Sequence, residues 1–189
     1  MRYDAIVIGA SAGGVEAIKI ILEELSIDYP IPIVIVLHMG VDFKTSIVEY
    51  FNDQFNLEVK CALEMKKVSK GVWIAPQDYH LFIENSGTFS ISHGEKELYS
   101  RPSIDLLFKS AAEVYKNKLV GILLTGTNND GTNGLKIIKK FGGLTIVQNP
   151  KMAYEPKMPQ SAIDNLEVDG IKTLQEIKYL LKELAEYGY

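Results

Sequence analysis

The chain of 189 residues contains a single cysteine, Cys61, and no long hydrophobic run. One cysteine excludes an internal disulfide, which fits a reducing cytoplasm. The longest apolar runs, such as IVIVL at residues 33–37, are far shorter than a membrane span, and Asp4 leaves too few apolar residues before Gly9 for a signal peptide. The sequence therefore predicts a soluble cytoplasmic protein with no membrane insertion.

The chain also lacks an excess of positive charge. Twenty Lys and Arg residues stand against 24 Asp and Glu residues, which gives a net charge of -4. This balance does not favour binding to nucleic acid or to an anionic membrane. With 47% hydrophobic residues, only seven prolines and no repeat or low-complexity linker, the chain can bury a substantial core. We expect one globular domain over residues 1–189, with a protein or a small molecule as its partner.

What the sequence does contain is a series of short strands that alternate with helical segments. Four runs are apolar almost throughout: AIVIG (5–9), IPIVIVL (31–37), LVGILLT (119–125) and GLTIV (143–147). Strands with no polar face are typical of a parallel sheet that helices cover on both sides. The pattern predicts an α/β fold, a three-layer α/β/α sandwich with a mainly parallel central sheet.

The segments between these runs show helical spacing of apolar residues, with one exception. The spacing predicts helices over residues 15–25, 43–51, 104–115, from the polar turn 126–134 to about 140, and 174–184. Residues 57–92 differ, because the runs VWIAP, HLFIE and TFSIS are separated by turn signals and predict a small antiparallel excursion. The segment KMPQSAI (157–163) is interpreted as the end of an irregular loop.

The stretch GASAGG at residues 9–14 fits two chemical templates. It resembles the glycine-rich turn of dinucleotide-binding domains, and it satisfies G-x-S-x-G, the nucleophile elbow. The nucleotide template fits badly, because Ser11 replaces its middle glycine and the second strand ends in His38 instead of an acidic residue. A third interpretation makes Ser11 the N-cap of the following helix.

His38 and Asp130 each have a structural interpretation when taken alone, as a hydrogen-bonded histidine and as a turn residue or helix cap. Together with Ser11 they follow the carboxyl ends of predicted parallel strands, which meet at one edge of a sheet. A serine needs a base to remove its proton, and that histidine needs a carboxylate to orient it. The three residues therefore predict a catalytic triad, in an order that differs from that of α/β-hydrolases.

These residues and their surroundings resemble the catalytic domain of the CheB family, the chemotaxis protein-glutamate methylesterases. The resemblance rests on six blocks that cover nearly the whole chain: VIGASAGG (7–14), LHMG (37–40), GVWIAPQDYHLFI (71–83), RPSIDLLFKSAA (101–112), LTGTNNDG (124–131) and MPQSAI (158–163). It implies that Ser11 is the nucleophile, His38 the general base and acid, and Asp130 the orienting carboxylate. Ala12, Thr127, Asn128 and Met158 are expected to form the oxyanion hole or line the site.

The resemblance also implies the substrate and the partners. We expect demethylation of glutamate methyl esters, and deamidation of glutamines, on the cytoplasmic helical bundle of methyl-accepting chemotaxis receptors. A chemotaxis kinase or a separate receiver protein is a further partner, and no metal or cofactor is required. The alternative functions are a catalytically silent module that binds the receptor or kinase and, less well supported, a nucleotide-binding domain.

Several positions depart from the family pattern. Gly126-Thr127-Asn128 stands where Gly-Met-Gly is usual, and Asn128 suits this turn if the turn requires a positive φ. Ala12 replaces a common hydroxyl residue, and Gly40 replaces a common proline. The given chain begins at the first predicted strand, without the receiver domain that is usual in the family, which fits either a stand-alone esterase or an excised fragment. No intrinsic phosphorylation switch is expected. Other motifs carry less weight: His80 is interpreted as a strand residue that shapes the sheet edge, His93 as a solvated loop residue, and residues 101–103 as a helix start.

Overall fold

The computed structural model of the chain describes residues 3–39 and 46–186, and its centre is a parallel sheet. The strands occur in the order β3-β4-β2-β1-β7-β8-β9, and every neighbouring pair is parallel. Their bounds are Ala5–Ala10 (β1), Ile33–Leu37 (β2), Val59–Cys61 (β3), Val72–Ile74 (β4), Leu119–Leu123 (β7), Leu144–Gln148 (β8) and Gly170–Lys172 (β9).

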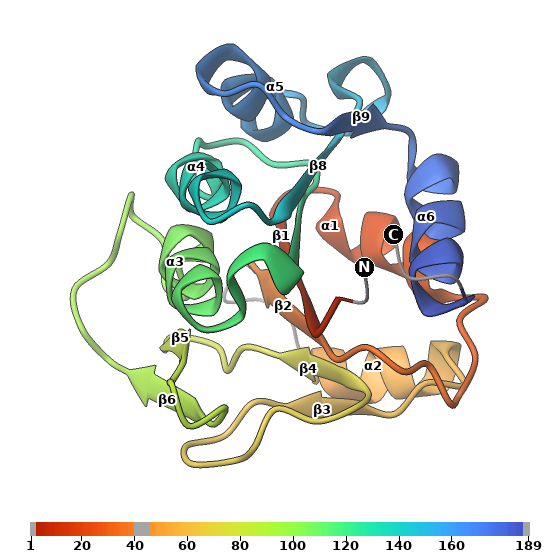
Figure 1. Cartoon of the computed structure of the whole chain (residues 1–189), viewed down its shortest axis with the longest axis vertical. Coiled ribbons are helices and arrows are strands. Elements are labelled where there is room, and N and C mark those ends of the chain that lie inside the picture. The colour runs from red at the N-terminus through yellow and green to blue at the C-terminus, as the bar shows by residue number, and fades with distance from the viewer. Residues whose placement is uncertain (1–2, 40–45, 187–189) are drawn as a thin grey trace.

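Within the described residues, six helices cover the two faces of this sheet (Figure 1). They are Gly14–Leu22 (α1), Ile47–Gln54 (α2), Ile104–Tyr115 (α3), Thr132–Lys140 (α4), Lys157–Asn165 (α5) and Leu174–Glu186 (α6), with 3-10 turns at Lys116–Lys118 and Pro150–Met152.

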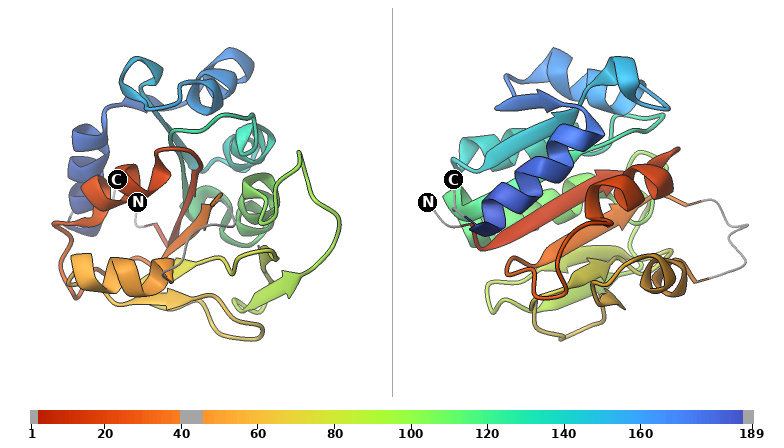
Figure 2. Two further views of the ribbon diagram at one scale, coloured as in Figure 1. Left: turned by 180° about the vertical axis from the view of Figure 1, so that it is seen from behind. Right: turned by 90° about the vertical axis from the view of Figure 1, so that its right-hand side faces the viewer.

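The strands β1, β2, β4, β7 and β8 supply side chains to two separate cores, one on each face of the sheet. Ile6 and Ile8 of β1 pack with α1, α2 and α6 on one face, whereas Ala5 and Val7 pack with α3, α4 and α5 on the other. Successive strand residues point to opposite faces, so a strand between two helix layers must be apolar at every position. Figure 2 shows the two layers from behind and from the side. The predicted three-layer α/β/α sandwich is confirmed.

The antiparallel excursion is smaller than the sequence predicted. Among the strands of the described residues, only His80–Ile83 (β5) and Phe89–Ser92 (β6) pair in antiparallel fashion, outside the main sheet. The run VWIAP was assigned to this excursion, but β4 pairs in parallel with both β2 and β3. All three residues of β4 are buried, because the strand lies inside the sheet instead of at an exposed hairpin.

Two further segments differ from expectation. The segment interpreted as an irregular loop is helix α5, and its proline, Pro159, lies in the first helical turn. Backbone N–H groups in that turn have no intrahelical partner, so the missing N–H of proline costs no helical hydrogen bond there. Strand β9 was not predicted. The start of the helix predicted for residues 43–51, like Gly40, lies outside the described residues, and α2 extends to Gln54.

A membrane-spanning helix is not found in the described part of the chain, where no helix combines the required length and hydrophobicity.

Candidate active site

Three neighbouring strands end at one edge of the sheet and present the residues that the sequence singled out. β1 lies between β2 and β7, and the three strands are parallel. Ser11 and His38 follow directly after β1 and β2, and Asp130 lies in the loop after β7. The N–H of His38 donates to the carbonyl of Ala10 at 2.9 Å, and the N–H of Ser11 donates to the carbonyl of Thr125 at 2.9 Å. These hydrogen bonds fix the backbone of Ser11 and His38, the first residues after β1 and β2.

The side chain of Ser11 does not cap the helix that follows it. The N-cap of α1 is Gly13, and no side chain caps this helix. Gly13 has a left-handed φ of +77°, and a side chain at this position would also collide with Tyr154. The carbonyl of Ser11 accepts the N–H of Gly14 at 2.7 Å, which closes the tight turn. The N-cap interpretation of Ser11 is therefore wrong, and its hydroxyl is not occupied by the helix.

The imidazole of His38 lies beside the carboxylate of Asp130. His38 Nε2 is 3.1 Å from Asp130 Oδ2, and the two side chains are 11% and 0% exposed. This is ion-pair distance, although neither ring nitrogen of His38 has a well-aligned hydrogen-bond partner among the described residues. Loosely aligned contacts are common in catalytic sites without substrate. Ser11 and His38 line the same recess of about 380 Å³, so all three predicted triad residues gather at this edge.

Donors from the first turn of α3 hold the buried carboxylate of Asp130. Its Oδ2 accepts the N–H of Ile104 at 2.7 Å, and its Oδ1 accepts the N–H of Asp105 at 2.9 Å and the hydroxyl of Ser103 at 3.1 Å. The helix dipole also favours a negative charge at this position. Burial raises the pKa of Asp130, but the contacts with His38, Asp105 and Ile104 outweigh burial and lower this pKa below its ordinary value. Asp130 is thus a charged helix cap. The helix that it caps is α3, and not α4, which follows Asp130 in the chain.

Most of this chain matches one family of known proteins. The family model described as CheB methylesterase matches residues 6–181. The chain belongs to the CheB methylesterase family. A protein of Leptospira interrogans named "Putative protein-glutamate methylesterase/protein-glutamine glutaminase" is 47% identical over 98% of this chain and 97% of its own length.

The CheB-family likeness extends to the three-dimensional structure. The crystal structure of the Thermotoga maritima CheB methylesterase catalytic domain matches with a TM-score of 0.91 and 33% sequence identity, over 97% of this chain and 100% of that chain. A protein-glutamate methylesterase/protein-glutamine glutaminase of Clostridium acetobutylicum is 33% identical over 92% of this chain and 51% of its own length. The chain therefore spans about half the length of some relatives and nearly all of others.

In this CheB-family chain, α3 and α4 cap each other. Asp130, which precedes α4, accepts donors from α3, and Asp105 in the first turn of α3 accepts the N–H of Gly134 in α4 at 2.6 Å. A Cβ at Gly134 would lie only 2.4 Å from Cβ of Phe108, so glycine permits this close approach. Burial raises the pKa of Asp105 to about 6; the Asp130 charge acts in the same direction, and the Gly134 N–H opposes it.

Replacing Asp105 with asparagine is expected to stabilise the protein at high pH. The pKa of Asp105 is about 6 in the fold against 3.8 without it, so the folded state binds this proton more tightly. The protonated carboxyl of Asp105 contributes its full stabilisation below pH 3.8, and this stabilisation is lost as the pH rises through 6. Asparagine keeps an oxygen for the Gly134 N–H without the charge. We expect Asp105→Asn to gain about 1 to 2 kcal/mol at pH 8, allowing for partial exposure, and much less at pH 4.

Thermal unfolding followed by circular dichroism at pH 4, 6 and 8 measures this difference. Asp53→Asn, which removes an exposed carboxyl from α2, is the matched control. An Asp105→Asn variant whose stability relative to wild type is the same at pH 4 and pH 8 would contradict the prediction.

Ala12 and Met158, two residues expected to line the site, both lie near Ser11. Ala12 lines the recess, and its carbonyl accepts the hydroxyl of Thr125 at 2.8 Å. Met158 is fully buried. A Cβ at Gly126 would lie 2.5 Å from Met158 Cε and 2.9 Å from Ser11 Cβ. Met158 therefore packs in the core behind Ser11 and not at the mouth of the recess.

Thr127 and Asn128, the other two expected lining residues, form the turn before Asp130. Thr127 is exposed and Asn128 is partly buried. The turn does not require a positive φ at Asn128, which is not among the described residues with left-handed backbone. Its Oδ1 instead accepts the N–H of Asp130 at 3.0 Å, and its Nδ2 donates to the hydroxyl of Ser100 at 3.3 Å. Asn128 thus helps to hold Asp130.

A second recess, of about 350 Å³, lies beside the first, and His38 and Met39 line both. Its other lining residues are Gln77, Asp78, Lys96, Tyr99, Ser100 and Arg101. The guanidinium of Arg101 lies 2.8 Å from Asp78 Oδ1 and lowers the pKa of Asp78 below its ordinary value, with a smaller effect from His93.

The sequence correctly predicted a helix start after residues 101–103, but two roles of this segment were missed. These are the Arg101–Asp78 ion pair and the hydrogen bond from Ser103 to Asp130. The block RPS before an apolar helical face was the available signal. Within residues 3–39 and 46–186, no cluster of His, Cys, Asp and Glu is arranged to hold a metal ion.

Proposed function

We propose that this chain is a protein-glutamate methylesterase that acts on chemoreceptors in the cytoplasm. It converts glutamate methyl esters to glutamate with release of methanol, and glutamines to glutamate with release of ammonia. The observation that supports this best is the buried Asp130 carboxylate 3.1 Å from His38, in a recess shared with Ser11, in a chain of the CheB family. The reaction itself follows the names of the relatives.

The three residues divide the chemistry of acyl transfer between them. The Ser11 hydroxyl attacks the ester carbonyl carbon while His38 takes its proton, and Asp130 stabilises the imidazolium that forms. Nε2 of His38 faces Asp130, so Nδ1 is the ring nitrogen left for Ser11. His38 then gives the proton to the departing methanol. A water molecule, activated by His38, hydrolyses the acyl-enzyme and releases glutamate.

The negative charge that develops on the carbonyl oxygen needs hydrogen-bond donors. Backbone N–H groups of Ala12 and of the turn at Thr127 and Asn128 are the candidates, because Ala12 lines the recess and the turn leads into Asp130. A donor of this kind contributes about 3 to 4 kcal/mol to transition-state stabilisation in other hydrolases. Neither a metal nor an organic cofactor is required for this mechanism.

Exposed aromatic residues beside the recesses fit a protein substrate. Tyr99, which lines the second recess, is 96% exposed, and Tyr154, which packs against Gly13, is 77% exposed. Tyrosine supplies large contact area with a polar end, and it is enriched in protein interfaces. We assign these residues to contact with the helical bundle of the receptor. A chemotaxis kinase or a separate receiver protein is the further partner.

The direct test is product release by the purified wild-type chain. Receptors of the same bacterium, carrying radiolabelled glutamate methyl esters, are incubated with the protein and released methanol is counted; ammonia is measured with unmethylated receptors that carry glutamines. We expect catalytic release above a buffer control. A fluorophosphonate probe followed by peptide mass spectrometry is expected to label Ser11.

A catalytically silent module would give a different result. It would bind the receptor, release neither product and leave Ser11 unlabelled, and this combination would overturn the proposed function. Turnover with labelling of another serine would retain the reaction but reassign the nucleophile.

A further inference from the structure

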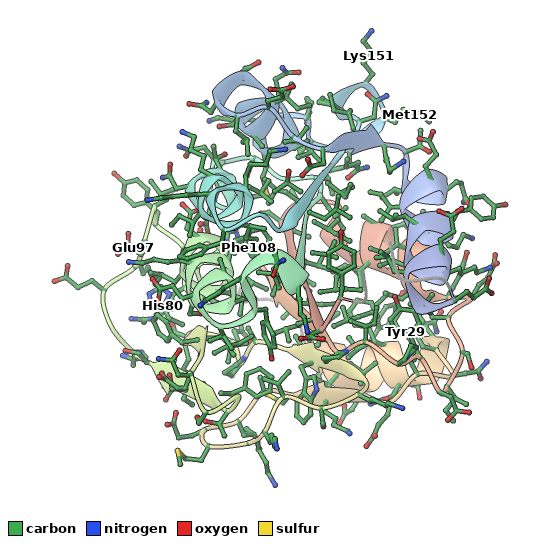
Figure 3. The ribbon with its side chains drawn as sticks, in the orientation of Figure 1. Tyr29, His80, Glu97, Phe108, Lys151 and Met152 are labelled. Atoms are coloured by element: carbon green, nitrogen blue, oxygen red, sulfur yellow. The ribbon has the colours of Figure 1, made fainter. Side chains whose placement is uncertain are left out.

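His80 is a buried histidine outside the triad, and both of its ring nitrogens are occupied. It begins β5, lies next to α3 (Figure 3) and is 2% exposed. Nε2 lies 2.7 Å from the carbonyl oxygen of Glu95, and Nδ1 accepts the N–H of Ser103 at 3.1 Å. A carbonyl can only accept and a backbone N–H can only donate, so the two partners fix a neutral ring with its proton on Nε2.

The partner of His80 on α3 is also a partner of the triad carboxylate. Ser103 is fully buried and is the N-cap of α3, and its Oγ accepts the N–H of Leu106 at 3.4 Å. The same hydroxyl donates to Asp130 Oδ1 at 3.1 Å, and the next two residues donate their N–H groups to Asp130. The backbone turn that His80 holds therefore carries three of the donors that orient Asp130.

We infer that His80 is a positioning residue for the reaction, acting on the Asp130–His38 pair through Ser103. A hydrogen bond from Ser103 to His80 fixes the start of α3, and the start of α3 keeps Asp130 Oδ2 directed at His38. His80 does not touch the reacting atoms. The inference rests on the proposed function, because its effect on turnover requires His38 and Asp130 to activate Ser11.

The two hydrogen bonds of His80 can be separated by substitution. In His80→Asn the amide oxygen lies near the position of Nδ1 and can accept the N–H of Ser103, but the shorter side chain cannot reach Glu95. In His80→Gln the amide nitrogen lies near the position of Nε2 and can donate to Glu95, but the acceptor for Ser103 is lost. A purely structural role in holding the Glu95 segment would favour the glutamine variant, whereas positioning of Asp130 favours the asparagine variant.

The experiment measures kcat and KM for methanol release by wild type, His80→Asn and His80→Gln, with the melting temperature of each protein. We expect His80→Asn to retain kcat within about threefold and His80→Gln to lose about tenfold to a hundredfold, with KM changed less than about threefold in both. The matched control is His93→Gln, because His93 is exposed and bonded to Asp78. Its kcat should equal that of wild type.

Ser103→Ala tests the next link without changing His80. It removes the hydroxyl that donates to Asp130, and it is expected to lower kcat about tenfold at unchanged KM. This variant decides the question if His80→Gln does not fold. Equal kcat in wild type and His80→Gln, equal losses in the two His80 variants, or full activity of Ser103→Ala would overturn the inference. An inactive wild type would instead show failure of the proposed function, and with it of the inference.

Discussion

Replacing Ser11 with alanine is expected to lower kcat for methanol release by about 10⁴-fold or more while the fold remains intact. Without the hydroxyl no acyl-enzyme can form, and only substrate binding and oxyanion stabilisation remain to catalyse the reaction. The fold should not change, because Ser11 is only half-buried and its side chain caps no helix. Its structural bonds involve the backbone N–H and carbonyl, which alanine retains.

Methanol release and thermal unfolding of the Ser11→Ala protein measure the two parts of this prediction. Ser86→Ala is the matched control, because Ser86 is an exposed serine in the turn of the small antiparallel sheet. Loss of activity together with loss of the fold would indicate a structural role for the hydroxyl. Wild-type turnover by Ser11→Ala would remove this residue as the nucleophile.

Asp130→Asn is expected to impair both catalysis and folding. The amide cannot stabilise the imidazolium of His38 and can fix the wrong tautomer, which costs about 10⁴-fold in kcat in a comparable triad. Its NH₂ group would also face N–H donors of Ile104 or Asp105 in a fully buried position. Opposed donors that cannot reach water are costly, and we expect a loss of about 3 kcal/mol in the free energy of unfolding.

The stability loss in Asp130→Asn should depend on pH with a defined sign. The fold lowers the pKa of Asp130, so the charged carboxylate contributes stability above the ordinary value of 3.8, and this contribution is lost as the pH falls further. The difference in unfolding free energy between wild type and variant should therefore be largest near neutrality and shrink below pH 4. Urea unfolding across this range measures it.

Asp164→Asn provides the control for that series. Its exposed carboxylate accepts a hydrogen bond from Gln160 on the surface of α5, so the substitution removes one charge at little cost. An Asp130→Asn protein as stable as Asp164→Asn at neutral pH would contradict the capping role. An Asp130→Asn protein with normal kcat would contradict the catalytic role.

The position of the site could be predicted from sequence because it depends on the central strands. Continuous apolar runs indicated parallel strands, and parallel strands bring Ser11, His38 and the loop to Asp130 to one edge. This step required no knowledge of side-chain contacts. The roles of these residues in the reaction stay a prediction until the variants are measured.

The errors have a common physical cause, which is that short elements depend on distant partners. β4 has three residues, and only its pairing with β2 and β3 distinguishes it from a hairpin strand. The segment of α5 was interpreted as the end of a loop, although its Pro159 occupies a helical turn that tolerates proline.

Side-chain contacts between distant loops could not be predicted from the sequence either. The donors to Asp130 from the start of α3 lie 25 to 27 residues before it, and Ser103 lies 23 residues after His80. Local patterns indicate that a residue can cap a helix, but they do not indicate which helix.

The capping of α3 by Asp130 has a consequence for which residues are lost when such a domain becomes inactive in evolution. Asp130 accepts donors from the first turn of α3 in a fully buried position, so losing its carboxylate weakens the scaffold itself. The side chain of Ser11 has no such structural role. If selection for catalytic activity were relaxed in a lineage, random mutation would replace Ser11 before Asp130. Inactive descendants should therefore retain the aspartate and lack the serine.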